Sequence, residues 1–190
     1  GASAGRNAVQ MLEAKSSPVN ESEFREQADA AQERISKLFR SSGGGESVSG
    51  LRREMNQTME EGAGIYRSDE SLRASSDVMK DVRRRFANIE LQDKSNVYNT
   101  DLIQVLELGA MIDVAQALIV AALERKESRG SHQRLDHTER NDESYLKHSL
   151  AYFSEGDLPD IKYRDVTITR SQPGERVYGG NINEQPHRRT

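Results

Sequence analysis

The chain has 190 residues, no cysteine and a formal net charge of −4, and 38 of its residues are Leu, Ile, Val or Phe. Without cysteine it has no disulfide framework, no Cys-ligated zinc ion and no Cys-ligated iron–sulfur cluster. The small net acidity gives no overall attraction to nucleic acid and little self-repulsion against folding. We therefore expect a folded region with a modest core, flanked by polar segments.

Two helices are expected in the first 45 residues. A short helix over residues 4–15 is indicated by helically spaced Ala, Val, Met and Leu. Asn20 then stands at an N-cap with Glu23 three positions later, which is the spacing of a capping box. Apolar residues follow at steps of three and four up to Leu38, and the glycines from Gly43 end this helix.

Two further amphipathic helices are expected next. Leu51, Met55 and Met59 recur every four residues, which predicts a helix from about residue 46 to residue 66. Ser68 can cap the following helix, whose apolar stripe runs from Leu72 towards residue 89.

The segment from Leu102 to Leu123 is the most apolar in the chain, with 17 apolar residues among 22. Asn99 gives it an N-cap, and we expect the helix to run to about Ser128 and to end at Gly130. Two carboxylates make it a poor membrane span, since each costs about 3 kcal/mol near the bilayer centre. A helix apolar nearly all round is expected in the middle of a bundle, with amphipathic helices against it.

The pattern changes after residue 130. A charged stretch is followed by apolar residues over 145–153 and by alternating ones over 161–168, whose phase slips at Asp165. We predict two short antiparallel strands joined by residues 154–160, with a bulge or break near Asp165.

The usual catalytic motifs are absent from the sequence. It has no G-x-G-x-x-G, no G-x-x-x-x-G-K-[ST] and no G-x-S-x-G, and Gly43–Gly45 follow a helix rather than a strand. His132 and His137 lie in a charged loop where a weak metal site is one alternative and a solvated or salt-bridged loop the other.

The densest group of charges follows the apolar helix. Arginine side chains there are favoured by the helix dipole and suit bidentate contacts to carboxylates. Either they form an internal ion-pair network that fixes the loop, or they contact an acidic ligand or partner. The candidate interface residues are Arg129, His132, Arg134, Asp136, Arg140 and Asp142.

The same stretch carries a family resemblance. The run Lys126–Asp136 (KESRGSHQRLD), followed by Arg140-x-Asp142 and Leu146-Lys147-His148, resembles the C-terminal region of the flavoprotein subunit of succinate dehydrogenase and fumarate reductase. Further agreements follow the same order along the chain: Met55 and Met59 before Gly64–Arg67, then Asn99–Leu102 and Glu107-Leu108, then Arg176–Gly180. L-aspartate oxidase shares the Glu-Ser-Arg-Gly-x-His element.

The resemblance implies an intact subunit that binds FAD and interconverts succinate and fumarate. Electrons would pass to an iron–sulfur subunit and then towards membrane quinone. The family's flavin-linking and substrate-binding motifs precede the region matched here, so we expect no catalytic, cofactor-binding or metal-binding residue in this chain. We also expect no flavin bound to the chain alone.

The implied partners are the flavin domain of the same subunit, the iron–sulfur subunit and, indirectly, membrane anchor subunits. Neither nucleic acid nor direct membrane insertion is expected. The implied location is peripheral, on the cytoplasmic or matrix face of an energy-transducing membrane. The alternatives are a freestanding helical interaction module and the C-terminal part of an L-aspartate oxidase-like flavoenzyme.

The predicted fold is mainly α, an antiparallel bundle of three to four helices with a small antiparallel β appendage. Residues 1–18 are expected to be the tail of a preceding flavin-domain helix, and residues 19–145 the bundle, braced by helix 20–40. The β appendage is expected over residues 146–180 and a mobile tail over residues 181–190.

Overall fold

The computed structural model describes residues 1–14, 20–41, 43–154, 156, 158–170 and 174. Two compact units divide the chain, residues 1–42 and residues 43–190. The first contains α1 (Ala2–Glu13) and α2 (Glu21–Arg40). The predicted cap of α2 is confirmed, because the Asn20 side chain accepts a hydrogen bond from the Ser22 amide.

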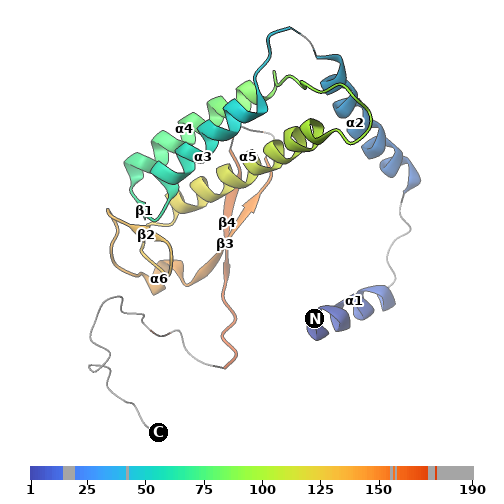
Figure 1. Cartoon of the computed structure of the whole chain (residues 1–190). Helices are drawn as coiled ribbons and strands as arrows, with labels where there is room; N and C mark the ends of the chain where they lie inside the picture. Colours follow the sequence, from blue (N-terminus) through green and yellow to red (C-terminus); the bar gives the residue numbers. More distant parts are fainter. Residues whose placement is uncertain (15–19, 42, 155, 157, 171–173, 175–190) are drawn as a thin grey trace. The chain divides into compact units, whose positions relative to one another are not determined.

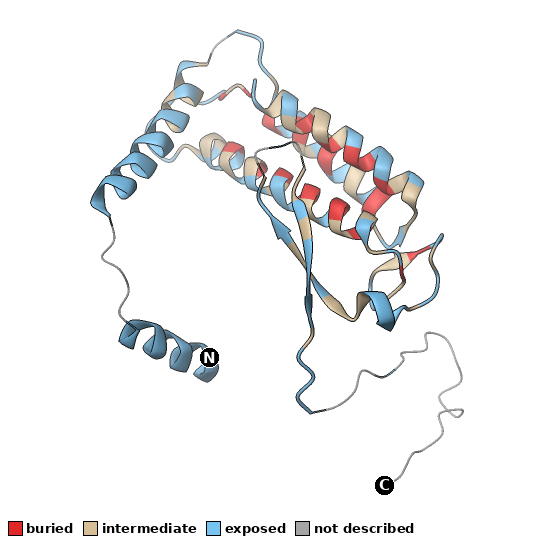
Figure 2. Ribbon diagram, turned by 180° about the vertical axis from the view of Figure 1, so that it is seen from behind, coloured by how far each residue is buried: buried red, intermediate tan, exposed pale blue. Residues whose placement is uncertain are grey.

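Three helices form the core of the second unit: α3 (Val48–Ala63), α4 (Asp69–Phe86) and α5 (Thr100–Glu124). Figure 1 shows them side by side, and Figure 2 shows that buried residues gather on their facing sides. Burying each large apolar side chain fully contributes about 1.5–3 kcal/mol to the stability of the fold. The large apolar side chains of these helices that are at most 3% exposed are Leu51, Met55, Leu72, Met79, Val82, Val105, Leu108, Ile112 and Ile119.

Side-chain caps start these helices. Ser47 accepts from the Gly50 amide at α3, Ser68 and Ser71 form a reciprocal capping box at α4, and Asn99 accepts from the Leu102 amide at 2.7 Å. The predicted caps at Ser68 and Asn99 are confirmed. The α3 start at Val48 differs from the expected residue 46 because Glu46 pairs in a β-bridge with Ile89.

A carboxylate clamp fixes the entry to α3 against the segment after α4. The Glu90 carboxylate accepts hydrogen bonds from the amides of Gly43, Gly44 and Gly45 at 3.2, 3.1 and 3.0 Å. These bonds lower the pKa of Glu90. Arg85, near the end of α4, reaches Glu46 at 2.7 Å and so reinforces the same junction.

Two small sheets complete the unit. β1 (Tyr66–Arg67) pairs in parallel with β2 (Gln133–Arg134), a pairing that the sequence pattern did not predict. β3 (Lys147–Tyr152) and β4 (Asp160–Asp165) form the predicted antiparallel pair, with Lys147 opposite Asp165. β4 ends at Asp165, where the alternation slips. The hairpin packs on α5, and the short helix α6 (Asp142–Tyr145) precedes it.

Two expectations about α5 need correction. The helix ends at Glu124 with Arg125 as its C-cap, and Gly130 lies in the following turn. The Arg125 backbone is extended and so ends the helix, and its side chain binds the hairpin. The helix is also not covered on every side, since Ile103 is 53% and Val114 67% exposed. By length and composition alone α5 passes as a membrane span, a test that core helices of soluble proteins also pass.

The prediction that helix 20–40 braces the bundle stays a prediction, as do the expected domain limits. The expected mobile tail at residues 181–190 lies outside the described residues, and so does most of the segment after residue 170.

Candidate functional site

The candidate site is the post-α5 loop, residues 125–142, and its centre is the carboxylate of Glu127. This side chain is fully buried. Its Oε1 accepts from Arg125 Nη1 at 2.6 Å and from Arg129 Nε at 2.8 Å. Its Oε2 accepts from Arg129 Nη2 and from the Asn141 amide, both at 2.9 Å. Burial alone would raise the pKa of Glu127, but these donors lower it on balance.

Arg134 lies beneath the loop, with its side chain fully buried. Its Nε and Nη2 donate to the two oxygens of Asp136 at 2.7 Å, and its Nη1 donates to the carbonyl of Ala122 at 2.8 Å. Arg134 thus binds a carbonyl in the last turn of α5, where the carbonyls lack helical partners, as well as its own loop. Its guanidinium holds the pKa of Asp136 far below the usual range, and the Asp69 amide adds a further bond to that carboxylate.

His132 connects the loop to the turn between α3 and α4. Its Nδ1 lies 3.0 Å from Arg67 Nη1, and its Nε2 lies 3.0 Å from the Arg125 carbonyl. Because a guanidinium only donates and a carbonyl only accepts, these contacts assign a neutral ring with its proton on Nε2. Burial is the main cause that lowers the pKa of His132, and the charges of Arg67 and Arg134 act in the same direction. Both ring nitrogens are engaged, so this histidine is not placed to bind a metal.

The outer part of the loop carries a second carboxylate, Asp142. It accepts from Arg129 Nη2 at 2.6 Å, from Arg140 Nε at 2.7 Å and from Arg140 Nη2. Arg140 is the first cause, and Arg129 the second, that lowers the pKa of Asp142. The side chains of Asp142, Arg129 and Arg140 are 45%, 25% and 23% exposed, so they form the outward face of the loop.

Arg125 is a central residue that the sequence reasoning missed. It donates to the carbonyls of Tyr145 and Lys147 at 2.8 and 2.7 Å and to Ser149 Oγ at 3.0 Å. Its guanidinium also lies over the rings of Tyr145 and Tyr163, 5.5 and 6.0 Å from their centroids. The sequence shows Arg125 as a basic residue at the end of an apolar helix. That position does not predict that its side chain binds the hairpin.

The structure thus brings all six predicted residues into one connected loop. The charges of the loop were expected either to pair with one another or to contact an acidic ligand or partner. The structure shows that they form an internal ion-pair network. The prediction of Arg134 as an interface residue needs correction. Its side chain is fully buried and does not reach the surface where a partner would bind. Asp142 is 45% exposed and the neighbouring Leu135 65%, whereas Arg129 and Arg140 are 25% and 23% exposed and bonded within the chain, Arg140 also to the Gly174 carbonyl at 2.8 Å. Within the described ranges no group of three or more His, Asp or Glu side chains could hold a metal ion.

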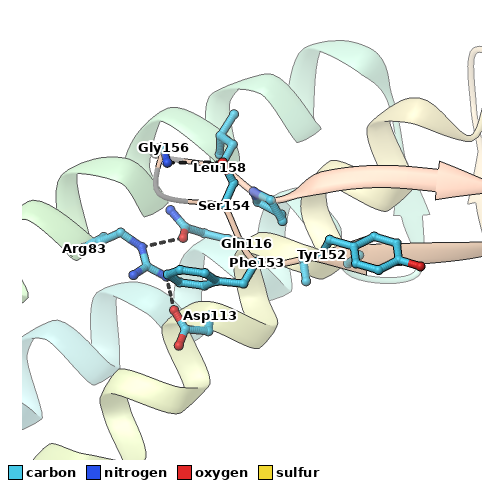
Figure 3. Close-up of a pocket in the computed structure, with 11 residues that line it drawn as sticks. Arg83, Asp113, Gln116, Tyr152, Phe153, Ser154, Gly156 and Leu158 are labelled. Carbon is cyan, nitrogen blue, oxygen red and sulfur yellow. Dashed lines mark hydrogen bonds and ion pairs between the residues drawn. The ribbon is translucent and has the colours of Figure 1, made fainter. Parts of the chain in front are cut away.

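A small pocket lies where the hairpin connection meets α4 and α5 (Figure 3). Arg83 spans it, donating from Nε to Gln116 Oε1 at 2.6 Å and from Nη2 to Asp113. Figure 3 shows the ring of Phe153 directed towards Arg83, whereas Tyr152 points away along the strand. The polar groups of the pocket therefore bind one another, and its lining seats the hairpin on the bundle.

The described residues do not fit a dinucleotide. A flavin diphosphate is held by backbone amides of a glycine loop between a strand and a helix. The amides of Gly43–Gly45 instead bind the Glu90 carboxylate, and a helix precedes them. The expectation that the chain alone binds no flavin stays a prediction.

Comparison with known proteins identifies the same family that the motifs of this loop resemble. Residues 52–178 match the family model described as fumarate reductase flavoprotein C-term. A fumarate reductase flavoprotein subunit of Haemophilus influenzae is 46% identical over 96% of this chain, and a succinate dehydrogenase flavoprotein subunit of Rickettsia bellii is 33% identical over 94%. The chain spans 30% of the length of each.

The fold agrees as well. A solved structure of a variant E. coli quinol fumarate reductase FrdA superposes with a TM-score of 0.81 at 40% identity, covering 88% of this chain and 29% of that chain.

Proposed function

Because the chain belongs to the succinate dehydrogenase/fumarate reductase flavoprotein family as its C-terminal domain, we propose that it buttresses the flavin domain and helps dock the iron–sulfur subunit. The relatives are oxidoreductase subunits, and FAD belongs to the intact flavoprotein. The whole subunit would interconvert succinate and fumarate, with electrons passing towards quinone. Identity of 46% over nearly the entire chain favours this role over a freestanding interaction module.

The proposed arrangement follows the expected domain limits. Residues 1–18 would be the last helix of the flavin domain, residues 19–145 the bundle and residues 146–180 the β appendage. The complex would lie at the cytoplasmic or matrix face of the membrane, and its anchor subunits would contact this chain only indirectly.

The observation that supports docking is the dense internal bonding of the post-α5 loop. Buried Glu127 and Arg134 hold its backbone from inside, while Asp142, Arg129 and Arg140 lie on its outer face. A surface ordered before binding loses less conformational entropy when a partner arrives. Charged groups at its rim would set the orientation of that partner.

A charge swap tests this role in a chimeric subunit, in which this chain replaces the matched region of the Haemophilus influenzae flavoprotein. Arg140→Glu should weaken co-purification with the iron–sulfur subunit at least about tenfold, since truncating a charged contact commonly costs more than 1.4 kcal/mol. Arg140→Gln removes the charge without placing a second carboxylate beside Asp142, which keeps its bond from Arg129, so it should weaken co-purification in the same direction. Arg84→Glu, at a side chain 74% exposed on α4, is the control.

Full assembly of the Arg140→Gln chimera would show that the charge of Arg140 does not reach a partner, and the docking role would then be wrong. Equal assembly of the wild-type and Arg140→Glu chimeras would contradict it as well.

A further inference from the structure

The turn that precedes β2 is fastened to β1 through the ring of His132. The ring accepts a hydrogen bond from Arg67 Nη1 at 3.0 Å and donates one to the carbonyl of Arg125 at 3.0 Å. The turn itself is tight, since the backbones of His132 and Arg129 exchange two hydrogen bonds around Gly130, whose φ is +59°. A displacement of the ring therefore displaces the turn.

Little apolar packing holds this turn against β1. The two strands pair over only two residues each. A hollow of about 660 Å³ is lined jointly by residues 63–67 and by Gly130, Ser131 and Gln133. Ile65 and Tyr66, which belong to this lining, are 74% and 66% exposed. A junction that buries so little apolar surface opens at a low free-energy cost, so the polar contacts of the ring matter for keeping it closed.

Positive charges surround the ring. The charged groups that act on it are guanidinium groups from three elements, Arg67 of β1, Arg125 at the C-cap of α5 and Arg134 of β2. The loop carboxylates are already bonded to arginines, Glu127 to Arg125 and Arg129, and Asp136 to Arg134. A proton on Nδ1 would add a fourth cation to this site. The ring would then present an N–H group to Arg67, which can only donate.

Arg67 is not free to withdraw from a protonated ring. Its Nε donates to the carbonyls of Ala63 and Gly64 at 3.0 and 2.9 Å, at the end of α3. A helix end leaves such carbonyls without helical partners, so Arg67 is bound there independently of the ring. The ring is therefore the group that leaves, and the turn leaves with it.

We propose that His132 is a pH-sensitive latch, whose neutral ring holds residues 129–133 on β1 and whose protonation releases them while the helical bundle stays folded. The rest of the loop has anchors of its own, because Arg134 binds the Ala122 carbonyl and Asp136 binds the Asp69 amide. The opening is therefore confined to β1 and the turn. The latch is a property of this chain alone and does not depend on the proposed function.

Hydrogen exchange of the 190-residue chain, followed by NMR spectroscopy, tests the latch. The Leu135 amide reports opening of the junction, because it donates to the Arg67 carbonyl at 2.8 Å. The pKa of the bound ring is lowered, whereas a released ring has the ordinary pKa of about 6.5, so opening becomes more favourable as the pH falls. After correction for intrinsic exchange, the protection of this amide should fall between about threefold and about 25-fold from pH 7 to pH 5.

Urea separates opening of the latch from unfolding of the whole unit. The Leu108 amide of α5 reports global unfolding, since its side chain is fully buried in the bundle. Below 1 M urea its exchange should accelerate, whereas that of the Leu135 amide should stay constant, because a local opening exposes little surface.

Two variants assign the pH dependence to the ring. His132→Gln can accept from Arg67 and donate to the Arg125 carbonyl but does not titrate, so it should remove the pH dependence of the Leu135 amide. His148→Gln is the matched control, because His148 is exposed on β3 outside the loop, and it should leave that dependence unchanged.

Three results would overturn the latch. Protection of the Leu135 amide that does not change with pH would show that the ring does not control the junction. Equal acceleration of Leu135 and Leu108 exchange by urea would show that the turn opens only with the whole fold. A pH dependence that persists in His132→Gln would assign it to another group. The first two results need only the wild-type chain, so they decide the question even where a variant does not fold.

Discussion

Replacing Glu127 by glutamine tests whether the buried carboxylate organises the post-α5 loop. The substitution keeps the shape of the side chain but removes its charge and turns one oxygen into an NH2 group. Four donors converge on Glu127, three of them from Arg125 and Arg129. Glutamine can still accept two of these bonds, and its NH2 group then faces the other two donors.

The expected loss follows from these contacts. Each hydrogen bond to a charged group is worth about 1.5–3 kcal/mol. Since the Arg125 and Arg129 side chains are 14% and 25% exposed, water recovers part of two lost bonds. We therefore expect Glu127→Gln to lower the free energy of unfolding by about 3 kcal/mol, within the range of about 3–5 kcal/mol for a broken buried ion pair. The corresponding fall in Tm is about 6–12 °C for a unit of this size.

Thermal and urea unfolding, followed by circular dichroism, measure both quantities. Glu107→Gln is the matched control, because Glu107 pairs with Arg52 at the surface and is 56% exposed. That change should cost less than about 1 kcal/mol. If Glu127→Gln and Glu107→Gln destabilise the protein equally, the buried carboxylate does not organise the loop and our reasoning is wrong.

Two further predictions concern stability. The pKa of His132 is lowered in the folded state, mainly by burial, so the unfolded chain binds its proton first and stability should fall over the interval below about pH 6.5, by at most about 1.4 kcal/mol per pH unit. His132→Gln, which can keep the contacts to Arg67 and Arg125, should flatten urea midpoints over this interval; an unchanged slope would contradict the assignment. Gly62→Ala should cost about 1–3 kcal/mol in urea unfolding, because its Cβ would lie 1.9 Å from Ser75 Oγ, and an undiminished midpoint would show that α3 and α4 are not closely packed there.

Local sequence signals predicted most of the helices and the hairpin. Asn20, Ser68 and Asn99 mark helix starts because an N-cap depends on residues within three positions of itself. The alternation around Tyr163 predicts a strand for the same reason, since a strand face repeats every two residues.

Features that depend on distant partners were not predictable in the same way. The two-residue strands at Tyr66 and Gln133 have no periodicity of their own and exist only because the chain returns to the same place. Arg134 and Arg129 look alike in sequence, yet one is fully buried and the other partly exposed. Arg134 differs in that it donates a hydrogen bond to the carbonyl of Ala122, near the end of α5. The family resemblance identified the loop, but not the orientation of its side chains.

The parallel pairing of Tyr66–Arg67 with Gln133–Arg134 has a consequence for the order of folding. It closes a ring of more than sixty residues, whereas α3, α4 and α5 each form from neighbours in the chain. Contacts that close long rings wait until the intervening segments are in place. We therefore expect the post-α5 loop to become ordered after α3 and α4, whose connection supplies its strand partner. During synthesis its charged face would form only after the bundle beneath it is complete. A partner that binds this face would therefore bind only a chain whose bundle has folded.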